Sequence, residues 1–216
     1  MTRGFLILAA LAASLPAQDF TVVPGERVGP ITARTRRSEL SQSFPAGAVE
    51  DDQIELDEGM LQPATLVYRK DPSQTLAISW TSAGTPKQVF ICWGLRRGAC
   101  RWQTTNGIRF GTRLSELETL NGGPFTISGF GYNYGGNVLS WNRGKLAPSR
   151  CSGRLVLTLD GERSGGLYTV PMANQELRSI RGDRPISSGT PAFQKLNPRV
   201  VGMLVAFSDP ETGTCE

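Results

Sequence analysis

The stretch ITARTRRSEL at residues 31–40 recurs as IRFGTRLSEL at residues 108–117, and this echo determines how we interpret the fold. The isoleucine, the Thr-Arg pair and the Ser-Glu-Leu ending repeat in register. In each copy a threonine, Thr35 or Thr112, stands where a helix N-cap is expected, and a glutamate follows in the first turn, where it favours the helix dipole. Each copy therefore predicts the start of a short helix.

Strand signals follow each predicted helix. Pro45 ends the first helix and the segment NGGP at 121–124 ends the second. The apolar runs that we interpret as strands are 64–68, 76–80 and 89–93 in the first half, and 124–128 and 138–141 in the second half. The endings ISW at 78–80 and LSW at 139–141 are interpreted as equivalent.

The last third adds two strongly apolar runs at 155–159 and 200–207, with short helices expected at 174–180 and 191–196. This pattern predicts an α+β fold made of two helix-plus-antiparallel-sheet repeats with a C-terminal β-rich extension. The expected parts are a first repeat at 18–103, a second at 104–150, and C-terminal strands at 151–216 that pack on the same domain.

The N-terminal segment predicts export. Arg3 precedes the run GFLILAALAASL at 4–15, which is shorter than the ~20 residues of a membrane-spanning helix. A basic start, a short apolar run and small residues after it are typical of a signal peptide. We expect residues 1–17 to be removed by cleavage after Ala17, and the remaining chain to be periplasmic or secreted with no membrane span.

The chain has four cysteines: Cys92, Cys100, Cys151 and Cys215. An even number in an exported chain predicts two disulfides, and three pairings are possible. We favour Cys92–Cys100, which encloses a short glycine-containing loop, together with Cys151–Cys215, which would stabilise the fold by about 4 kcal/mol through loop entropy. A zinc site is the alternative, but the spacings match no common zinc pattern and there is no histidine, so no metal site is expected.

The absence of histidine also removes Ser-His-Asp triads and Cys-His pairs. Oxidised cysteines leave no thiol nucleophile, and no Ser-x-x-Lys motif is present. The sequence therefore predicts a protein that is not an enzyme and has no cofactor. The remaining enzymatic alternative is a carboxylate pair from the acidic run at 50–58, which matches neither a glycosidase nor a calcium loop and is interpreted as a solvated acidic loop.

The first candidate binding segment is FGYNYGG at 130–136. Phe130, Tyr132 and Tyr134 alternate, so on a strand their rings would share one face. Phe130 is interpreted as core. Tyr132 and Tyr134 are candidate ligand-binding residues for a sugar or a protein loop, with burial in the core as the alternative.

The second candidate is the loop between Cys92 and Trp102, inside the predicted disulfide. Its candidate binding residues are Trp93, Arg96, Arg97 and Arg101. Arginine and tryptophan are enriched in binding hot spots, and a constrained loop loses less entropy on binding. The alternative is an ordinary solvated hairpin tip.

Several motifs together resemble an uncharacterised family of exported bacterial proteins: 107–117, 121–125, a strand ending at Trp141, 21–35 and 196–200. More distantly, each half is similar to the repeats of β-lactamase inhibitory protein and of the small lipoprotein of the outer-membrane barrel-assembly machine. The resemblance implies a layered repeat with a sheet face available to a protein partner. This chain departs from both in lacking a lipid-attachment cysteine, in an insertion at 50–63 and in its C-terminal extension.

These features predict an exported non-catalytic binding protein of the protein-interaction or inhibitor type. The alternative is a carbohydrate- or peptidoglycan-binding or -cleaving envelope protein that uses carboxylates. The expected partner is another envelope or extracellular protein, or a glycan. A net charge of +4 is too mild to indicate a nucleic-acid partner.

Overall fold

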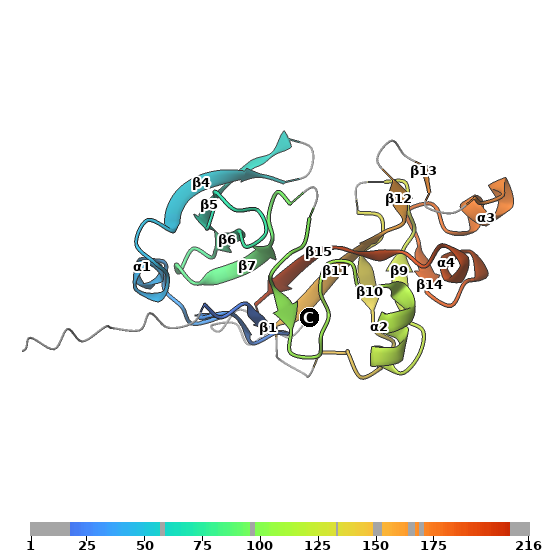
Figure 1. The fold of residues 1–216 in the computed structure, drawn as a ribbon, viewed down its shortest axis with the longest axis horizontal. Coiled ribbons are helices and arrows are strands. Elements are labelled where there is room, and N and C mark those ends of the chain that lie inside the picture. Colours follow the sequence, from blue (N-terminus) through green and yellow to red (C-terminus); the bar gives the residue numbers. More distant parts are fainter. Residues whose placement is uncertain are drawn as a thin grey trace, which may run out of the picture.

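A six-stranded antiparallel sheet runs through the middle of the molecule (Figure 1), with the strand order β11-β15-β7-β6-β5-β4. Its strands are β4 (Val49–Glu55), β5 (Leu61–Val67), β6 (Leu76–Trp80), β7 (Pro86–Ile91), β11 (Arg154–Asp160) and β15 (Arg199–Ala206). The computed structural model describes residues 18–56, 59–95, 98–132, 134–148, 153–163, 167–168 and 171–207. The five strands that the sequence predicts for this sheet are present as β5, β6, β7, β11 and β15. The sixth strand, β4, lies where an acidic loop was expected at 50–58, so that expectation is wrong.

Smaller sheets flank this one. The first has the order β3-β2-β1-β8, with β1 (Thr21–Val23), β2 (Arg27–Val28), β3 (Ile31–Thr32) and β8 (Gln103–Thr104). The second has the order β10-β9-β14, with β9 (Thr126–Ser128), β10 (Val138–Ser140) and β14 (Pro185–Ser187). β12 (Glu162–Arg163) pairs only with β13 (Leu167–Tyr168) in the described part of the chain. The mixture of helices and antiparallel strands confirms the α+β class.

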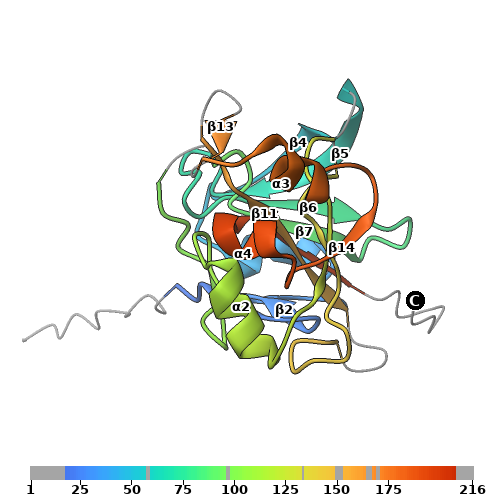
Figure 2. The same cartoon turned by 90° about the vertical axis from the view of Figure 1, so that its right-hand side faces the viewer.

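The helices are short: η1 (Arg37–Glu39), α1 (Leu40–Ser43), α2 (Leu114–Asn121), α3 (Asn174–Ser179) and α4 (Pro191–Leu196). Figure 2 shows α2, α3 and α4 gathered at one end of the molecule with β14. Gly122 ends α2 in the left-handed conformation (φ 83°), and α4 begins with proline, as the sequence signals predict. No helix in the described ranges is long and apolar enough to cross a membrane.

The echoed segments have the same local geometry. Thr35 and Thr112 are not the N-caps that the sequence suggests; their hydroxyls accept hydrogen bonds from the backbone N–H of residues 32 (2.9 Å) and 109 (3.0 Å). The N-caps are Arg36 and Arg113, and each donates its backbone N–H to the glutamate three residues later, at 3.0 and 2.7 Å. The threonine hydroxyls are thus used in the turn before each helix, one residue ahead of the N-cap.

The two tryptophan endings occupy different places in the fold. Trp80 ends β6, the third strand after α1, whereas Trp141 follows β10, the second strand after α2. The interpretation of these endings as equivalent is therefore wrong. Each ring instead packs locally: the Trp80 indole N–H donates to the Thr65 hydroxyl at 3.0 Å, and the Trp141 ring lies 4.9 Å from that of Phe125.

The main core fills the space between one face of the large sheet and the surrounding elements. Buried side chains reach it from β3 (Ile31), α1 (Leu40), α2 (Leu117) and α4 (Phe193), and from the sheet itself. Along β6 and β7 alternate residues point into this core because successive side chains of a strand face opposite sides. These elements therefore cover one face of the sheet, whereas Ala77 and Phe90 point to the other face.

Candidate functional site

The second face of the six-stranded sheet has its own, smaller apolar cluster. Its buried members are Ile54, Ala64, Leu66 and Ala77, and Leu56, Phe90 and Trp93 pack against them. All of these residues belong to strands β4–β7 or to the turns that leave them. Within the described residues, no helix and no second sheet contributes to this cluster. We call this surface the open face.

The register of the sheet arranges a row of side chains across the open face. Neighbouring strands pair the residues of the row in the order Glu50, Leu66, Ala77, Phe90, Leu204 and Val156. Directly opposed residues of antiparallel strands share a face, so the whole row points the same way. From Leu66 to Val156 the row crosses four strand spacings, or about 19 Å.

The apolar side chains of the row are buried at one end and half-buried at the other. Ala77 is 0% exposed and Leu66 is 5% exposed, whereas Phe90, Leu204 and Val156 are half-buried. The row therefore passes from buried side chains on β5 and β6 to half-buried ones on β7, β15 and β11. Contact between apolar surface and water is unfavourable, so covering this surface with a partner lowers the free energy.

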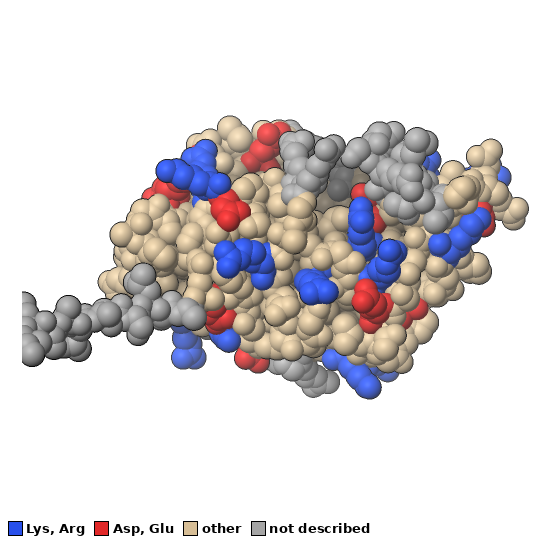
Figure 3. Space-filling view, in the orientation of Figure 1, with Lys and Arg blue, Asp and Glu red and all other residues tan. Residues whose placement is uncertain are grey.

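A charged rim follows the apolar row on the β4 side. The Arg69 guanidinium lies 2.7 Å from the Asp52 carboxylate and 3.8 Å from that of Glu50. Figure 3 shows acidic and basic side chains together at this end of the molecule. Exposed ion pairs of this kind contribute only about 0–1 kcal/mol to stability, so their main effect here is to set the charge pattern beside the apolar row.

The predicted disulfide between Cys92 and Cys100 is present, with its sulfur atoms 2.04 Å apart. Cys92 follows directly on β7, and its backbone takes the left-handed conformation (φ 52°), which turns the chain away from the sheet. The Trp93 ring, half-buried, lies edge-on to Phe90 with ring centroids 5.2 Å apart. The loop therefore starts on the open face, and Trp93 is the predicted binding residue that the structure places there.

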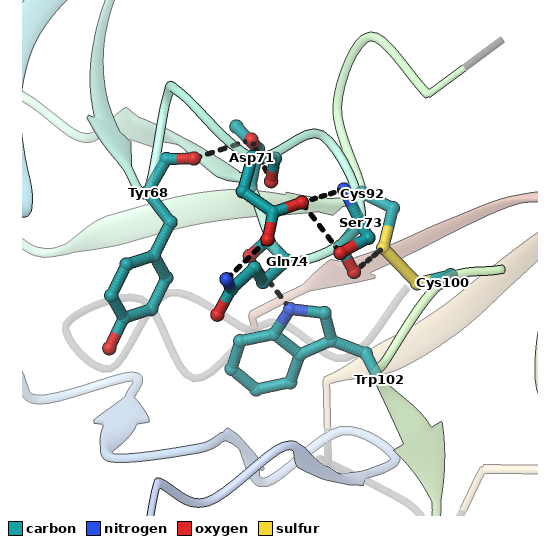
Figure 4. The surroundings of a disulfide bond; sticks show 8 residues. Tyr68, Asp71, Ser73, Gln74, Cys92, Cys100 and Trp102 are labelled. Atoms are coloured by element: carbon teal, nitrogen blue, oxygen red, sulfur yellow. Dashed lines mark hydrogen bonds between the residues drawn. A yellow bond between two sulfur atoms is a disulfide. The ribbon is translucent and has the colours of Figure 1, made fainter. Parts of the chain in front are cut away.

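Hydrogen bonds fasten the base of the disulfide loop to the β5–β6 turn (Figure 4). The backbone N–H of Arg101 donates to the Ser73 carbonyl at 2.8 Å. The Trp102 indole N–H donates to the Gln74 carbonyl at 2.9 Å, as Figure 4 shows. The Cys92 sulfur lies 3.0 Å from that same Ser73 oxygen. The loop is thus held by contacts at its base as well as by the disulfide.

Asp71 organises the turn that receives the loop. Its carboxylate accepts hydrogen bonds from the Ser73 hydroxyl (2.6 Å) and backbone N–H (3.0 Å), and from the Gln74 amide. These bonds from Ser73 and Gln74 favour the ionised form and lower the pKa of Asp71 below that of an ordinary carboxyl group. The turn is therefore most rigid when Asp71 is charged.

The other predicted loop residues do not gather on the open face. Arg101 is exposed and its guanidinium lies 4.3 Å from the centre of the Phe20 ring, which packs against the main core. Trp102 is 1% exposed and belongs to that core. Arg96 and Arg97 lie outside the described residues. Trp93 and Arg101, near the two ends of the loop, therefore face different layers of the molecule.

The aromatic segment at 130–136 is not a strand. It is the loop between β9 and β10, and Gly131 (φ 92°) and Gly136 (φ 82°) take left-handed conformations that break the alternation. The prediction of three rings on one strand face is therefore wrong, although Phe130 is buried as expected, edge-on to Phe193 at 5.3 Å. Tyr134 lies on a turn and is 57% exposed, whereas Tyr132 lies on a bend and is half-buried.

Asp51, in the acidic run, does not have the environment of a general acid. The Asp51 carboxylate lies 2.8 Å from the Arg37 guanidinium and accepts a hydrogen bond from the Thr65 hydroxyl at 2.8 Å. Both contacts lower the pKa of Asp51, whereas a general acid needs a raised pKa. In the described part of the chain no group of three or more cysteine or carboxylate side chains is placed to hold a metal ion.

Cys151 and Cys215 lie outside the described residues, so their pairing stays a prediction. The open-face residues Phe90, Leu204 and Val156 were not among the predicted site residues. Their signal in the sequence is a run such as VVGMLVAF at 200–207, where both alternating sets are apolar and neither face looks solvent-exposed.

Comparison of the chain with protein-family models, with curated proteins and with solved structures found no match.

Proposed function

We propose that the protein is an exported, non-catalytic binding protein of the protein-interaction or inhibitor type, and that a partner protein docks on the open face. The observation that supports this most directly is the apolar row from Leu66 to Val156. Its side chains on β7, β15 and β11 stay half-buried, and no described helix contributes to the cluster at its β5–β6 end. An apolar centre with a polar, charged rim is the usual anatomy of a protein–protein interface.

The rigidity of the site supports the same function. The Cys92–Cys100 disulfide, the Asp71 turn and the buried Trp102 hold the loop in place before any partner arrives. Binding then costs less conformational entropy. Trp93, at the junction of loop and sheet, is the residue that we expect to act as the hot spot.

The arrangement of elements supports an internal repeat, which we propose as the basis of the fold. One half would be α1 with β4, β5, β6 and β7; the other would be α2 with β9, β10, β11 and β15. β7 and β15 meet side by side at the middle of the large sheet, and a bridge between Asn137 and Thr158 joins β10 to β11. The second half would thus include two strands from beyond residue 150, β11 and β15. The elements from β12 to α4 would be an insertion between these two strands. A relationship to the repeats of β-lactamase inhibitory protein and the barrel-assembly lipoprotein stays a proposal.

Export stays part of the proposal. Residues 1–17 would be removed as a signal peptide, and the disulfide between Cys92 and Cys100 suits an oxidising compartment such as the periplasm. The partner would then be an envelope or extracellular protein. A glycan is a poorer fit, because Trp93 and Phe90 pack edge-on to each other and do not form a flat platform.

The test is partner capture with matched variants. The chain from residue 18 onward is used as bait for an envelope extract, beside Phe90→Arg on the open face and Thr105→Arg at an exposed turn after β8. We expect Phe90→Arg to weaken retention of the specific partner by at least about thirtyfold, since a hot-spot change costs ~2 kcal/mol or more. Thr105→Arg should leave it unchanged. Retention that is the same for both variants would remove the open face from the proposal, and turnover of a defined substrate would contradict the non-catalytic assignment.

A further inference from the structure

Strand β4 forms one border of the large sheet, and in the described chain it pairs only with β5. The pairing shows which backbone groups point outward. Tyr68 N–H donates to Ala48 O and Leu56 N–H donates to Met60 O, both at 2.9 Å, so the even-numbered positions from 48 to 56 bond to β5. In an antiparallel ladder bonded and non-bonded positions alternate. The N–H and C=O groups of residues 49, 51, 53 and 55 therefore point away from the sheet.

The outer edge of β4 is exposed and acidic. Glu50, Asp51, Gln53 and Glu55 are exposed, and the Asp51 side chain keeps 64% of its surface despite its ion pair with Arg37. β4 carries four carboxylates, and among the described residues the ion pairs with them come from Arg37 and Arg69 alone. Figures 1 and 2 show the β4–β5 hairpin extending from the body of the molecule, so this edge is reachable.

The charge pattern disfavours a second copy of this chain at the edge. Antiparallel pairing of two β4 strands about Asp52 would place the two Asp52 residues opposite each other, with Glu50 and Asp51 of each copy close by. Like charges in opposed positions destabilise a strand pair, and natural edge strands use such charges to prevent self-association. The edge repels itself but keeps a full row of outward hydrogen-bonding groups.

The hairpin tip carries two exposed apolar side chains, Met60 (66% exposed) and Leu61 (63% exposed). A membrane surface is a poor match for them, because anionic headgroups repel the neighbouring carboxylates. A protein segment with basic and apolar residues in alternation would match both the tip and the edge.

We propose that β4 binds an extended basic segment of another protein, which joins the sheet as an additional strand. Its backbone would bond to residues 49, 51, 53 and 55, its lysine or arginine side chains would lie beside Asp51, Asp52 and Glu55, and an apolar residue would contact Met60 or Leu61. Main-chain bonds supply affinity in this mode of recognition and side chains supply specificity. This edge shares Asp52 with the charged rim of the open face, but the backbone bonds of strand addition do not depend on that face.

The test uses the chain from residue 18 onward with a short blocked peptide of alternating lysine and valine, and a glutamate–valine peptide as control. Amide hydrogen exchange is read by NMR. We expect the lysine peptide to protect the amides of residues 49, 51, 53 and 55 selectively, since those of the even-numbered positions are already bonded, and the glutamate peptide to protect none. Glu55→Lys should weaken the lysine peptide by about fivefold, as one cross-strand charge pair is lost and a like pair is introduced.

A proline variant tests the strand addition itself. Gln53→Pro removes one outward N–H and leaves the β4–β5 bonds intact, and proline is tolerated on edge strands. Gln53→Ala keeps that N–H. We expect Gln53→Pro to abolish peptide binding and Gln53→Ala to retain it within about twofold. The proposal is overturned if Gln53→Pro binds the lysine peptide normally or if both peptides protect the β4 amides equally. It is also overturned if the peptide-induced changes in amide exchange fall on Phe90 and Leu204. The last outcome would leave the open-face function standing. Binding to anionic phosphatidylglycerol vesicles that Met60→Ser abolishes would also overturn it.

Discussion

Removal of the Cys92–Cys100 disulfide has an effect that can be worked out from the chain. The two cysteines are eight residues apart, so the bond closes a short loop. On the chain-entropy argument, a loop of this length restricts the unfolded chain by about 2.5 kcal/mol at 25 °C. The double variant Cys92→Ala with Cys100→Ala should lose about that much stability, and its Tm should fall by ~5–10 °C for a domain of this size.

The variant should nevertheless fold. The contacts that fasten the loop base to Ser73 and Gln74 involve backbone groups and the buried Trp102, and none of them needs the sulfur–sulfur bond. Urea unfolding followed by tryptophan fluorescence, together with calorimetry, measures the change in the free energy of unfolding. Trp102→Phe with the disulfide intact is a companion variant, since it removes the indole bond to Gln74 together with part of a buried ring and leaves the loop closure unchanged. A loss below about 1 kcal/mol would refute the loop-entropy reasoning. Failure to fold would refute the claim that the turn contacts suffice.

Two further predictions concern backbone packing and acid stability. Gly136→Ala should cost more than about 3 kcal/mol, because a Cβ there would meet the Leu159 carbonyl oxygen at 2.0 Å, whereas Gly94→Ala, at a similar positive φ but in open space, should cost about 1 kcal/mol; equal Tm losses would contradict this. Asp71 has a lowered folded-state pKa, so its contribution to stability is present above its ordinary pKa of about 3.9 and is lost as the pH falls below that value towards the folded pKa. Unfolding free energies measured between pH 2 and 6 should therefore fall less steeply in Asp71→Asn, and identical slopes would exclude the role of the Ser73 and Gln74 hydrogen bonds.

Local chemistry accounts for the elements that the sequence predicts well. α4 occupies the expected range because proline begins it and Asn197 ends it in the left-handed conformation. α2 ends at Gly122 for the same reason. The Cys92–Cys100 pair is predictable because a short loop with glycine brings its ends together. Each of these signals lies within a few residues of the structure that it determines.

The acidic strand and the aromatic loop were misinterpreted for a different reason. Carboxylates are poor strand formers on their own, and β4 forms because seven consecutive residues pair with β5 and because Ile54 is buried in the cluster of the open face. In the aromatic segment the glycines allow left-handed turns, and Gly136 makes the close approach to Leu159 that only the folded protein requires.

By itself, the sequence determined the α+β composition, the helix ends, the short disulfide loop and the lack of a histidine-based catalytic site. Only the tertiary structure decided which face of the sheet stays uncovered. Strands such as β7 and β15 are apolar on both sides, so their pattern is the same whichever side receives the helices. Long-range packing places α1, α2 and α4 on one side, and this choice leaves Phe90, Leu204 and Val156 facing outward.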